Sequence, residues 1–243
     1  MARISFSDID KRIEEKKSYV ANGGNFKRIN ALWLKDRESA YVKVLLDDIK
    51  NVEVHSVHLV KMMSKSGKSY NIHVDCLGNN CPLCEEAKKH TEEKYPKVTK
   101  VRDMVYVPLL SFVNYEGEEE LNFAILARST SWASSDFFPD MARYGIDSNF
   151  EIQRTGSGTS TTYRFYPANK LGNGNAFPKI DMNQVYTDLS IELPDDIYGR
   201  EDSFVRNWDE AQMLEYIETD KFPKPKENNV ADEVTPRTTN HGF

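Results

Sequence analysis

The sequence lacks the features that define several protein classes. No apolar run approaches the roughly 18 residues that cross a membrane, and residues 1–17 are polar and charged, unlike a signal peptide. We therefore expect no transmembrane or targeting segment. The chain has only 3 cysteines, an odd number that makes a poor disulfide framework. This cysteine usage argues against a disulfide-stabilised secreted protein and indicates the reducing cytoplasm.

Positive charge is scarce overall but unevenly distributed. The formal net charge is −6. Residues 1–171 carry 25 Lys and Arg against 23 Asp and Glu, whereas residues 172–243 carry 7 against 15. The nearly neutral body can therefore hold a basic groove for a polyanion. The acidic end can compete with polyanions, recruit basic partners or form an ordinary solvated surface.

The three cysteines, Cys76, Cys81 and Cys84, lie within nine residues. Thiolates this close together on a turn are suited to tetrahedral Zn²⁺. A thioredoxin-like redox pair is an alternative, because Cys81 and Cys84 also stand at a helix start. That pair should follow the first strand of a βαβ unit, which the sequence does not show, and it gives Cys76 no role. Incidental buried thiols are a further alternative. We predict one structural Zn²⁺ per chain.

The fourth ligand is expected among nearby histidines, of which the sequence offers His55, His58, His73 and His90. If Gly67 centres a hairpin, His58 and Cys76 lie opposite one another and share a face. His58 is therefore the predicted ligand. His73 is expected on the opposite face of the hairpin. His55 lies an odd number of residues from the position opposite Cys76, so it should not share its face. Both remain alternatives. His90 follows Cys84 in a helix and points in a poor direction.

Alternating apolar patterns and turn residues predict a mainly β chain with α additions. Strands are expected at residues 39–46, 52–63, 69–76, 101–113, 121–128, 150–154 and 161–166. Helices are expected at 7–21, 85–94, 129–144 and 208–217. Many strands, one internal helix and a metal loop favour a small β-barrel over a parallel α/β sheet. Residues 222–243 are rich in proline and poor in apolar residues, which indicates disorder.

Four stretches together resemble the zinc-containing single-stranded DNA-binding, or helix-destabilising, proteins of tailed bacteriophages. They span roughly residues 30–170 and comprise LWLK followed by AYVKVLL at 32–46, the histidine-to-cysteine segment at 57–76, the CPLC knuckle at 81–84, and IQRTGSG with TYRFYP at 152–167. The resemblance implies an OB-fold at residues 30–171 with a zinc subdomain at about 55–95. An N-terminal helix or arm at 1–29 and an acidic extension with short helices at 172–221 flank it.

The resemblance also implies a function. Proteins of this family coat and protect single-stranded DNA during phage replication, recombination and repair, without catalysis and without sequence specificity. The expected location is the cytoplasm of the infected bacterial host. Expected partners are phage replication and recombination proteins, together with further copies of the chain on DNA.

A sequence-tolerant DNA binder needs cations along a groove and aromatic rings on which bases stack. Several predicted strands place tyrosine beside arginine or lysine. For any single aromatic a core position is the better interpretation, so the prediction depends on the set. The candidate DNA-binding residues are Tyr41, Lys43, Arg102, Tyr106, Arg128, Trp132, Arg154, Tyr163, Arg164 and Tyr166.

Two other functions are alternatives. A zinc-ribbon accessory protein of transcription or replication would act on duplex DNA or through protein contacts. A metal-dependent nuclease would need a cluster of carboxylates and histidines, and the sequence offers no convincing one. The pairs Asp47-Asp48 and Asp195-Asp196 are better interpreted as acids at strand ends and in loops.

Overall fold

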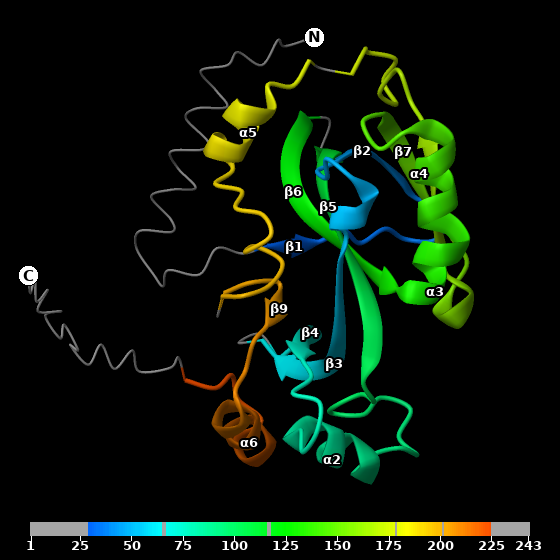
Figure 1. Ribbon diagram of the computed structural model, residues 1–243. Coiled ribbons are helices and arrows are strands. Elements are labelled where there is room, and N and C mark those ends of the chain that lie inside the picture. Colours follow the sequence, from blue (N-terminus) through cyan, green and yellow to red (C-terminus); the bar gives the residue numbers. More distant parts are fainter. Residues whose placement is uncertain (1–28, 65–66, 116–117, 178, 201, 225–243) are drawn as a thin grey trace, which may run out of the picture.

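The computed structural model describes residues 29–64, 67–115, 118–177, 179–200 and 202–224. The predicted helix at 7–21 and most of the tail at 222–243 lie outside the described residues. The described chain is a mixed α+β fold in which one sheet curls into a half-barrel (Figure 1). Among the described residues no helix is long and apolar enough to span a membrane.

The sheet has nine strands in the order β8-β7-β2-β5-β3-β4-β9, with β6 paired to β5 and to β1. Pairing is antiparallel except between β1 and β6 and between β4 and β9. The strands are β1 (Asn30–Ala31), β2 (Ser39–Val44), β3 (Glu53–Met63), β4 (Ser69–Asp75), β5 (Arg102–Tyr115), β6 (Glu118–Ser129), β7 (Asn149–Thr155), β8 (Thr162–Pro167) and β9 (Val205–Arg206).

The helices are short and begin or end at residues suited to those positions. They are α2 (Pro82–Lys89), α3 (Thr130–Trp132), a π-helical turn (Ala133–Phe137), α4 (Phe138–Tyr144), α5 (Met182–Asp188) and α6 (Glu210–Thr219), with single 3₁₀ turns at Ile49–Asn51 and Gly158–Ser160. Pro82 occupies the first turn of α2, where its missing N–H is harmless. Asp209 caps α6 through a capping box with Gln212. Gly145 ends α4 with φ 82°, a conformation that favours glycine.

The long strand β5 separates two hydrophobic cores, because alternate side chains point to opposite faces of a sheet. Val107 and Leu109 belong to the first core, beneath α3 and α4. Tyr106 and Leu110 belong to the second core, which the C-terminal extension covers with residues such as Ile197. Both faces of β5 are therefore buried. This explains its nearly continuous apolar sequence.

A third core lies at the end of the molecule where α2 and α6 stand side by side (Figure 1). It combines Val60 and Val74 of the β3–β4 hairpin with Leu83 of α2 and Met213 and Tyr216 of α6. We call this unit, formed by the β3–β4 hairpin, α2 and α6, the hairpin module. Its core includes Cys81, so its packing and the cysteine cluster are a single structure.

The predicted strands and the helices at 129–144 and 208–217 are confirmed, with small shifts at their ends. The expected register of the β3–β4 hairpin was wrong by two residues. His58 pairs with Val74, and the backbone N–H of Cys76 donates to Ser56. A shift of two keeps both side chains on the predicted face, since faces alternate with a period of two. The helix predicted at 85–94 is α2, which begins at Pro82 and ends at Lys89. The helix α5 lies in the extension where short helices were expected, whereas β1 and β9 were not predicted.

Candidate functional site: a metal cluster beside a basic groove

His58, Cys76, Cys81 and Cys84 converge in the hairpin module. One ligand atom from each, all four lying within 4.8 Å of one another, could hold a metal ion. The Nε2 of His58 is 3.7 Å from the Sγ of Cys81 and 3.4 Å from that of Cys84. The two sulfurs of Cys76 and Cys84 are 3.6 Å apart. The predicted ligand set is thus brought together around one point.

These separations match a tetrahedral zinc site. With Zn–S bonds of about 2.3 Å and Zn–N bonds of about 2.0 Å, tetrahedral geometry puts two sulfurs about 3.8 Å apart and sulfur about 3.5 Å from nitrogen. The observed 3.6 Å between Cys76 and Cys84 and 3.4 to 3.7 Å to His58 lie close to these values. Three thiols and one imidazole also form a donor set that zinc favours. The residues therefore fit one structural metal ion.

The orientation of His58 is fixed by a hydrogen bond to the backbone. Its Nδ1 lies 2.8 Å from the carbonyl oxygen of Thr99. A carbonyl can only accept, so Nδ1 carries the proton and Nε2 keeps its lone pair for a metal. Thr99 is itself held to β3, since its Oγ1 accepts from the backbone N–H of Leu59 at 3.0 Å. Burial lowers the pKa of His58, which favours the neutral, ligating form.

The other three histidines have partners elsewhere. The Nδ1 of His73 lies 2.8 Å from the hydroxyl of Tyr106, on the opposite face of the hairpin. The ring of His55 lies 4.2 Å from that of Tyr198, measured between centroids. His90 follows α2, where Glu86 and Glu93 flank it. The structure therefore gathers His58, and none of the alternatives, with the cysteines.

The loop between β4 and α2 is shaped to aim the three sulfurs. Gly78 and Asn80 adopt positive φ values of 76° and 62°, which turn the chain sharply between Cys76 and Cys81. The backbone N–H of Gly78 donates to the Cys76 sulfur at 3.4 Å, and the N–H of Cys84 donates to the Cys81 carbonyl at 3.0 Å. Burial, reinforced by Cys76, raises the pKa of Cys84 to about 12. Burial also raises the pKa of Cys76, so without a cation the thiols of Cys76 and Cys84 stay protonated at neutral pH, and a metal would displace the protons.

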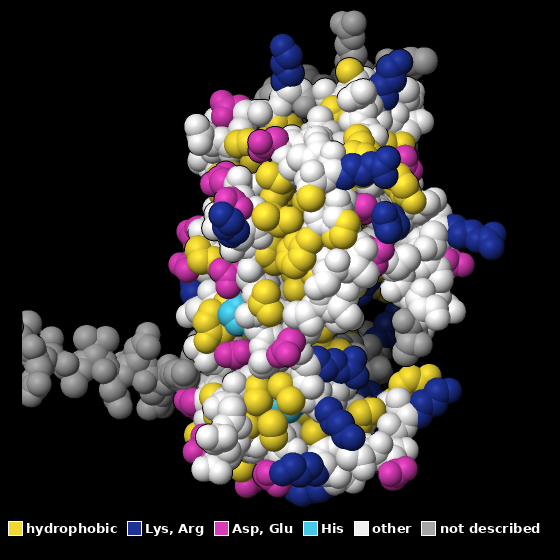
Figure 2. All heavy atoms as spheres, turned by 45° about the vertical axis from the view of Figure 1, so that its right-hand side comes forward, with side chains coloured by type: hydrophobic (Ala, Val, Ile, Leu, Met, Phe, Trp, Pro, Cys, Tyr) yellow, Lys and Arg dark blue, Asp and Glu magenta, His cyan; other side chains and the backbone are white. Residues whose placement is uncertain are grey.

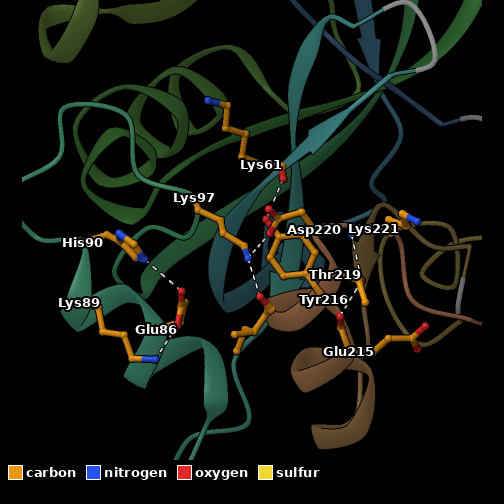
Figure 3. A network of polar contacts seen from close by, with 11 residues as sticks. Lys61, Glu86, Lys89, His90, Lys97, Glu215, Tyr216, Thr219, Asp220 and Lys221 are labelled. Carbon is orange, nitrogen blue, oxygen red and sulfur yellow. Dashed lines mark hydrogen bonds and ion pairs between the residues drawn. The ribbon is translucent and has the colours of Figure 1, made fainter.

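Helix α6 completes the module from the far end of the chain. The Sδ of Met213 lies 3.9 Å from the Sγ of Cys81. Figure 3 shows Tyr216 reaching back to β3, where its hydroxyl donates to the carbonyl of Lys61 at 2.8 Å. Lys97 pairs with Asp220 and donates to the carbonyl of Ile217 at 2.8 Å. The acidic extension is thus part of the unit that holds the cysteines.

A groove of about 700 Å³ runs beside this module, between the outer face of the β3–β4 hairpin and residues 90–100. We call it the basic groove. Its lining includes Lys61, Lys94, Lys100 and Arg102, none of which forms an ion pair with a described residue, against one acid, Glu93. Tyr95, whose surface is 73% exposed, stands at the groove. Figure 2 shows lysine and arginine side chains on both the upper and the lower half of the face, several of them close together near its lower end.

The prediction that three residues stack on bases was wrong, because their rings are buried. Tyr106 and Tyr163 are fully buried, and Trp132 is 6% exposed. Each has a structural role. Tyr106 is the hydroxyl partner of His73 and belongs to the second core. The indole N–H of Trp132 donates to the carbonyl of Tyr163 at 3.0 Å. The curled sheet needs large side chains to fill its interior, and these rings fill it.

Three more predicted contacts are engaged within the protein. Arg164 forms ion pairs of 2.9 Å with both Asp136 and Asp140. The Nζ of Lys43 donates to the carbonyl of Asp147 at 2.8 Å. The half-buried ring of Tyr41 packs edge-on against Phe177, with centroids 5.9 Å apart. Among the described residues, these partners reduce what the three side chains can offer to a ligand.

The remaining four predicted residues keep accessible chemistry. Arg102 is exposed in the basic groove, and Tyr166 is 45% exposed on β8. Arg128 and Arg154 are half-buried and have no carboxylate partner among the described residues. Sequence reasoning missed Lys61, Lys94, Tyr95 and Lys100 of the basic groove. The signal available for the last three was the lysine and tyrosine cluster around Pro96, just beyond the helix predicted at 85–94.

A second cavity, of about 810 Å³, lies between β2 and the C-terminal extension. Its lining mixes Lys43 and Lys50 with Asp47, Glu53 and Asp147, and much of the rest is apolar. The mixed charge makes it a weaker candidate for a polyanion than the basic groove, despite its size.

Comparison with known proteins gave no match, either to a protein-family model or to a curated protein.

Proposed function

We propose that this protein binds single-stranded DNA without sequence specificity, on an OB-fold-like half-barrel whose inserted hairpin module is held by one structural Zn²⁺. The basic groove carries this proposal. Four cations without acidic partners line one hollow, and an exposed tyrosine stands beside them. The resemblance to the helix-destabilising proteins of tailed bacteriophages supports the same function.

The composition of the groove suits an unpaired strand. Lys61, Lys94, Lys100 and Arg102 can neutralise phosphates, which gives affinity without reading sequence. The ring of Tyr95 offers a face to an unstacked base, and a duplex keeps its base faces covered. Preference for single strands follows from that difference. The interaction is reversible binding, with no bond made or broken.

The metal would act by holding the hairpin module in its folded shape. A closed set of four protein ligands leaves no position for water or substrate, so the ion would be structural. Its ligand His58 also joins β3 to residues 97–100 through the hydrogen bond from Nδ1 to the carbonyl of Thr99, and this joint is one wall of the groove. The bacteriophage DNA metabolism implied by the resemblance, with its replication and recombination partners, belongs to the same proposal.

The direct test is a fluorescence-anisotropy titration of the full chain with labelled oligo-dT and with a duplex of equal length, across a salt series. If the four cations each contact a phosphate, they should contribute about −3 to the slope of log K against log salt. Replacing Lys100 and Arg102 together by Gln should reduce the steepness of that slope by about 1.4. Equal affinity for oligo-dT and duplex would refute the proposal.

Matched controls separate the groove from general charge loss. Lys221→Gln removes one exposed cation beside α6, outside the groove, and should leave the slope nearly unchanged. Tyr95→Ala should weaken oligo-dT binding by about 1 to 3 kcal/mol. Tyr70→Ala, which removes a 48% exposed tyrosine from the hairpin, is its control. If Tyr95→Ala and Tyr70→Ala weakened oligo-dT binding equally, base stacking could not be assigned to the groove.

A further inference from the structure

A second constellation lies at the edge of the first core, where Arg128 and Arg154 approach one buried tyrosine. The guanidinium carbon of Arg128 lies 4.0 Å from the centre of the Tyr163 ring. Arg154 is directly opposite Tyr163 in the β7–β8 pair, so the two side chains share a face. Two like charges are thus brought to the same ring.

These two arginines use little of their hydrogen-bonding capacity. A guanidinium has five N–H donors. Arg128 donates to the carbonyl of Ala127 at 3.2 Å, and Arg154 donates to that of Leu34. The Nε of each is buried and has no hydrogen-bond partner among the described residues. Buried polar groups are nearly always bonded, so two neighbouring exceptions point to a partner outside the described residues.

The charge balance indicates what that partner is. Neither arginine has a described carboxylate within ion-pair distance, whereas nearby Arg164 has two. Burial lowers the pKa of Arg128; Tyr163 opposes this effect, and the charge of Arg154 adds to it. An anion placed between the two guanidinium groups would relieve both the repulsion and the unmet donors. Planar arginine forks are well matched to phosphate oxygens.

An exposed aromatic stands beside the pair. Trp33 lies between the buried Leu32 and Leu34, and its own surface is 68% exposed because an extended segment alternates its faces. The guanidinium carbon of Arg154 is 6.0 Å from the centre of its ring. A large open indole next to a phosphate-type site is the arrangement that holds one nucleotide by its backbone and its base.

We propose that Arg128 and Arg154 together bind one phosphate of single-stranded DNA, and that Trp33 stacks on an adjoining base. This nucleotide subsite is separate from the basic groove in its residues, and it rests on the proposed function, which supplies the polynucleotide. Tyr163 has a positioning role, since its ring supports the guanidinium of Arg128 from within the core.

Intrinsic fluorescence tests the stacking directly. The chain has 3 tryptophans, and Trp132 and Trp208 are buried at 6% and 3% exposure. Trp33 should therefore account for most of the emission that iodide can quench. Saturating oligo-dT should quench Trp33 emission and shield it from iodide, and an abasic oligonucleotide of equal length should do neither. In Trp33→Phe, the oligo-dT quenching should largely disappear. Unchanged quenching in that variant would overturn the stacking role.

Salt dependence tests the shared phosphate. Arg128→Met and Arg154→Met each remove one of the two cations. If both arginines hold one phosphate, each single variant and the double variant should lose the same increment of slope, about 0.7. An increment of about 1.4 in the double variant would show two independent contacts and overturn the proposal. Unaltered slopes would overturn it as well.

Two controls keep these outcomes distinct. Arg143→Met removes an exposed arginine that lies over Tyr144 on α4, and it should not alter the Trp33 signal. Because Arg128 and Arg154 contact the core, each variant is first checked for unchanged near-ultraviolet circular dichroism, and Arg154→Lys serves as a milder second variant. A chain that binds oligo-dT in its basic groove with no change at Trp33 refutes the subsite alone. A chain that binds no oligo-dT refutes the proposed function.

Discussion

If the cluster holds the proposed structural Zn²⁺, loss of that ion should unfold the hairpin module. The third core depends on α2 and α6 being held to the β3–β4 hairpin, and Cys81 is itself 1% exposed within it. Structural zinc sites have apparent binding free energies of about 10 to 16 kcal/mol. A whole domain is stable by only about 5 to 15 kcal/mol. The metal term is therefore as large as the total stability, and without it the module should not stay folded.

The perturbation is His58→Ala, together with chelation of the unmodified chain under reducing conditions. The expected zinc content falls from one ion per chain to well below one, and Trp208, which belongs to the third core, becomes accessible to iodide. Trp132, in the first core, should stay protected. Metal analysis, helicity by circular dichroism and tryptophan quenching report these changes.

His90→Ala is the matched control, because His90 is close in sequence to the cysteines yet pairs with Glu86 and Glu93 outside the cluster. It should keep its zinc and its third core. A fully reduced chain that loses its metal to a chelator and still keeps α2 and α6 folded and Trp208 protected from iodide would refute the reasoning.

Two further predictions concern the stability of the half-barrel. Arg164→Met leaves the buried carboxylate of Asp140 short of a partner and should lower the free energy of unfolding in urea by about 1 to 3 kcal/mol. The salt slope of DNA binding should stay nearly unchanged. Loss of DNA binding at unchanged stability would contradict this prediction. Burial lowers the pKa of His73 to about 4 from 6.5. As the pH falls, the unfolded chain therefore binds a proton at His73 before the folded chain does. The contribution of neutral His73 to the free energy of unfolding is complete above pH 6.5, and that free energy falls by up to about 3 kcal/mol as the pH drops to 4. In His73→Gln the stability curve between these pH values should flatten, and an unaltered curve would show that His73 does not cause the fall.

The strands and the ligand set of the cluster could be predicted from sequence because both are local patterns. Alternation fixes which residues share a face, and a two-residue error in hairpin register leaves the faces of His58 and Cys76 unchanged. The base-stacking residues could not be predicted in the same way. Tyr163 and Tyr166 are three residues apart on β8, so they face opposite sides, and only the curl of the sheet decides that Tyr163 is the buried one. The covering helix α4 also supplies Asp140, which engages Arg164.

The C-terminal extension shows why local patterns were insufficient for the groove. Its acidity favoured an interpretation as a separate, solvated region, yet α6 contributes Met213 and Tyr216 to the third core, more than 120 residues after α2. The Tyr216 hydroxyl holds the carbonyl of Lys61, and Asp220 engages Lys97. By pairing Lys97, α6 removes one cation from the surface near the groove, and by binding the Lys61 backbone it fixes the strand from which another projects. The acidic helix α6 therefore affects both the backbone and the charge of the basic groove, so the charges of the two regions cannot be interpreted separately.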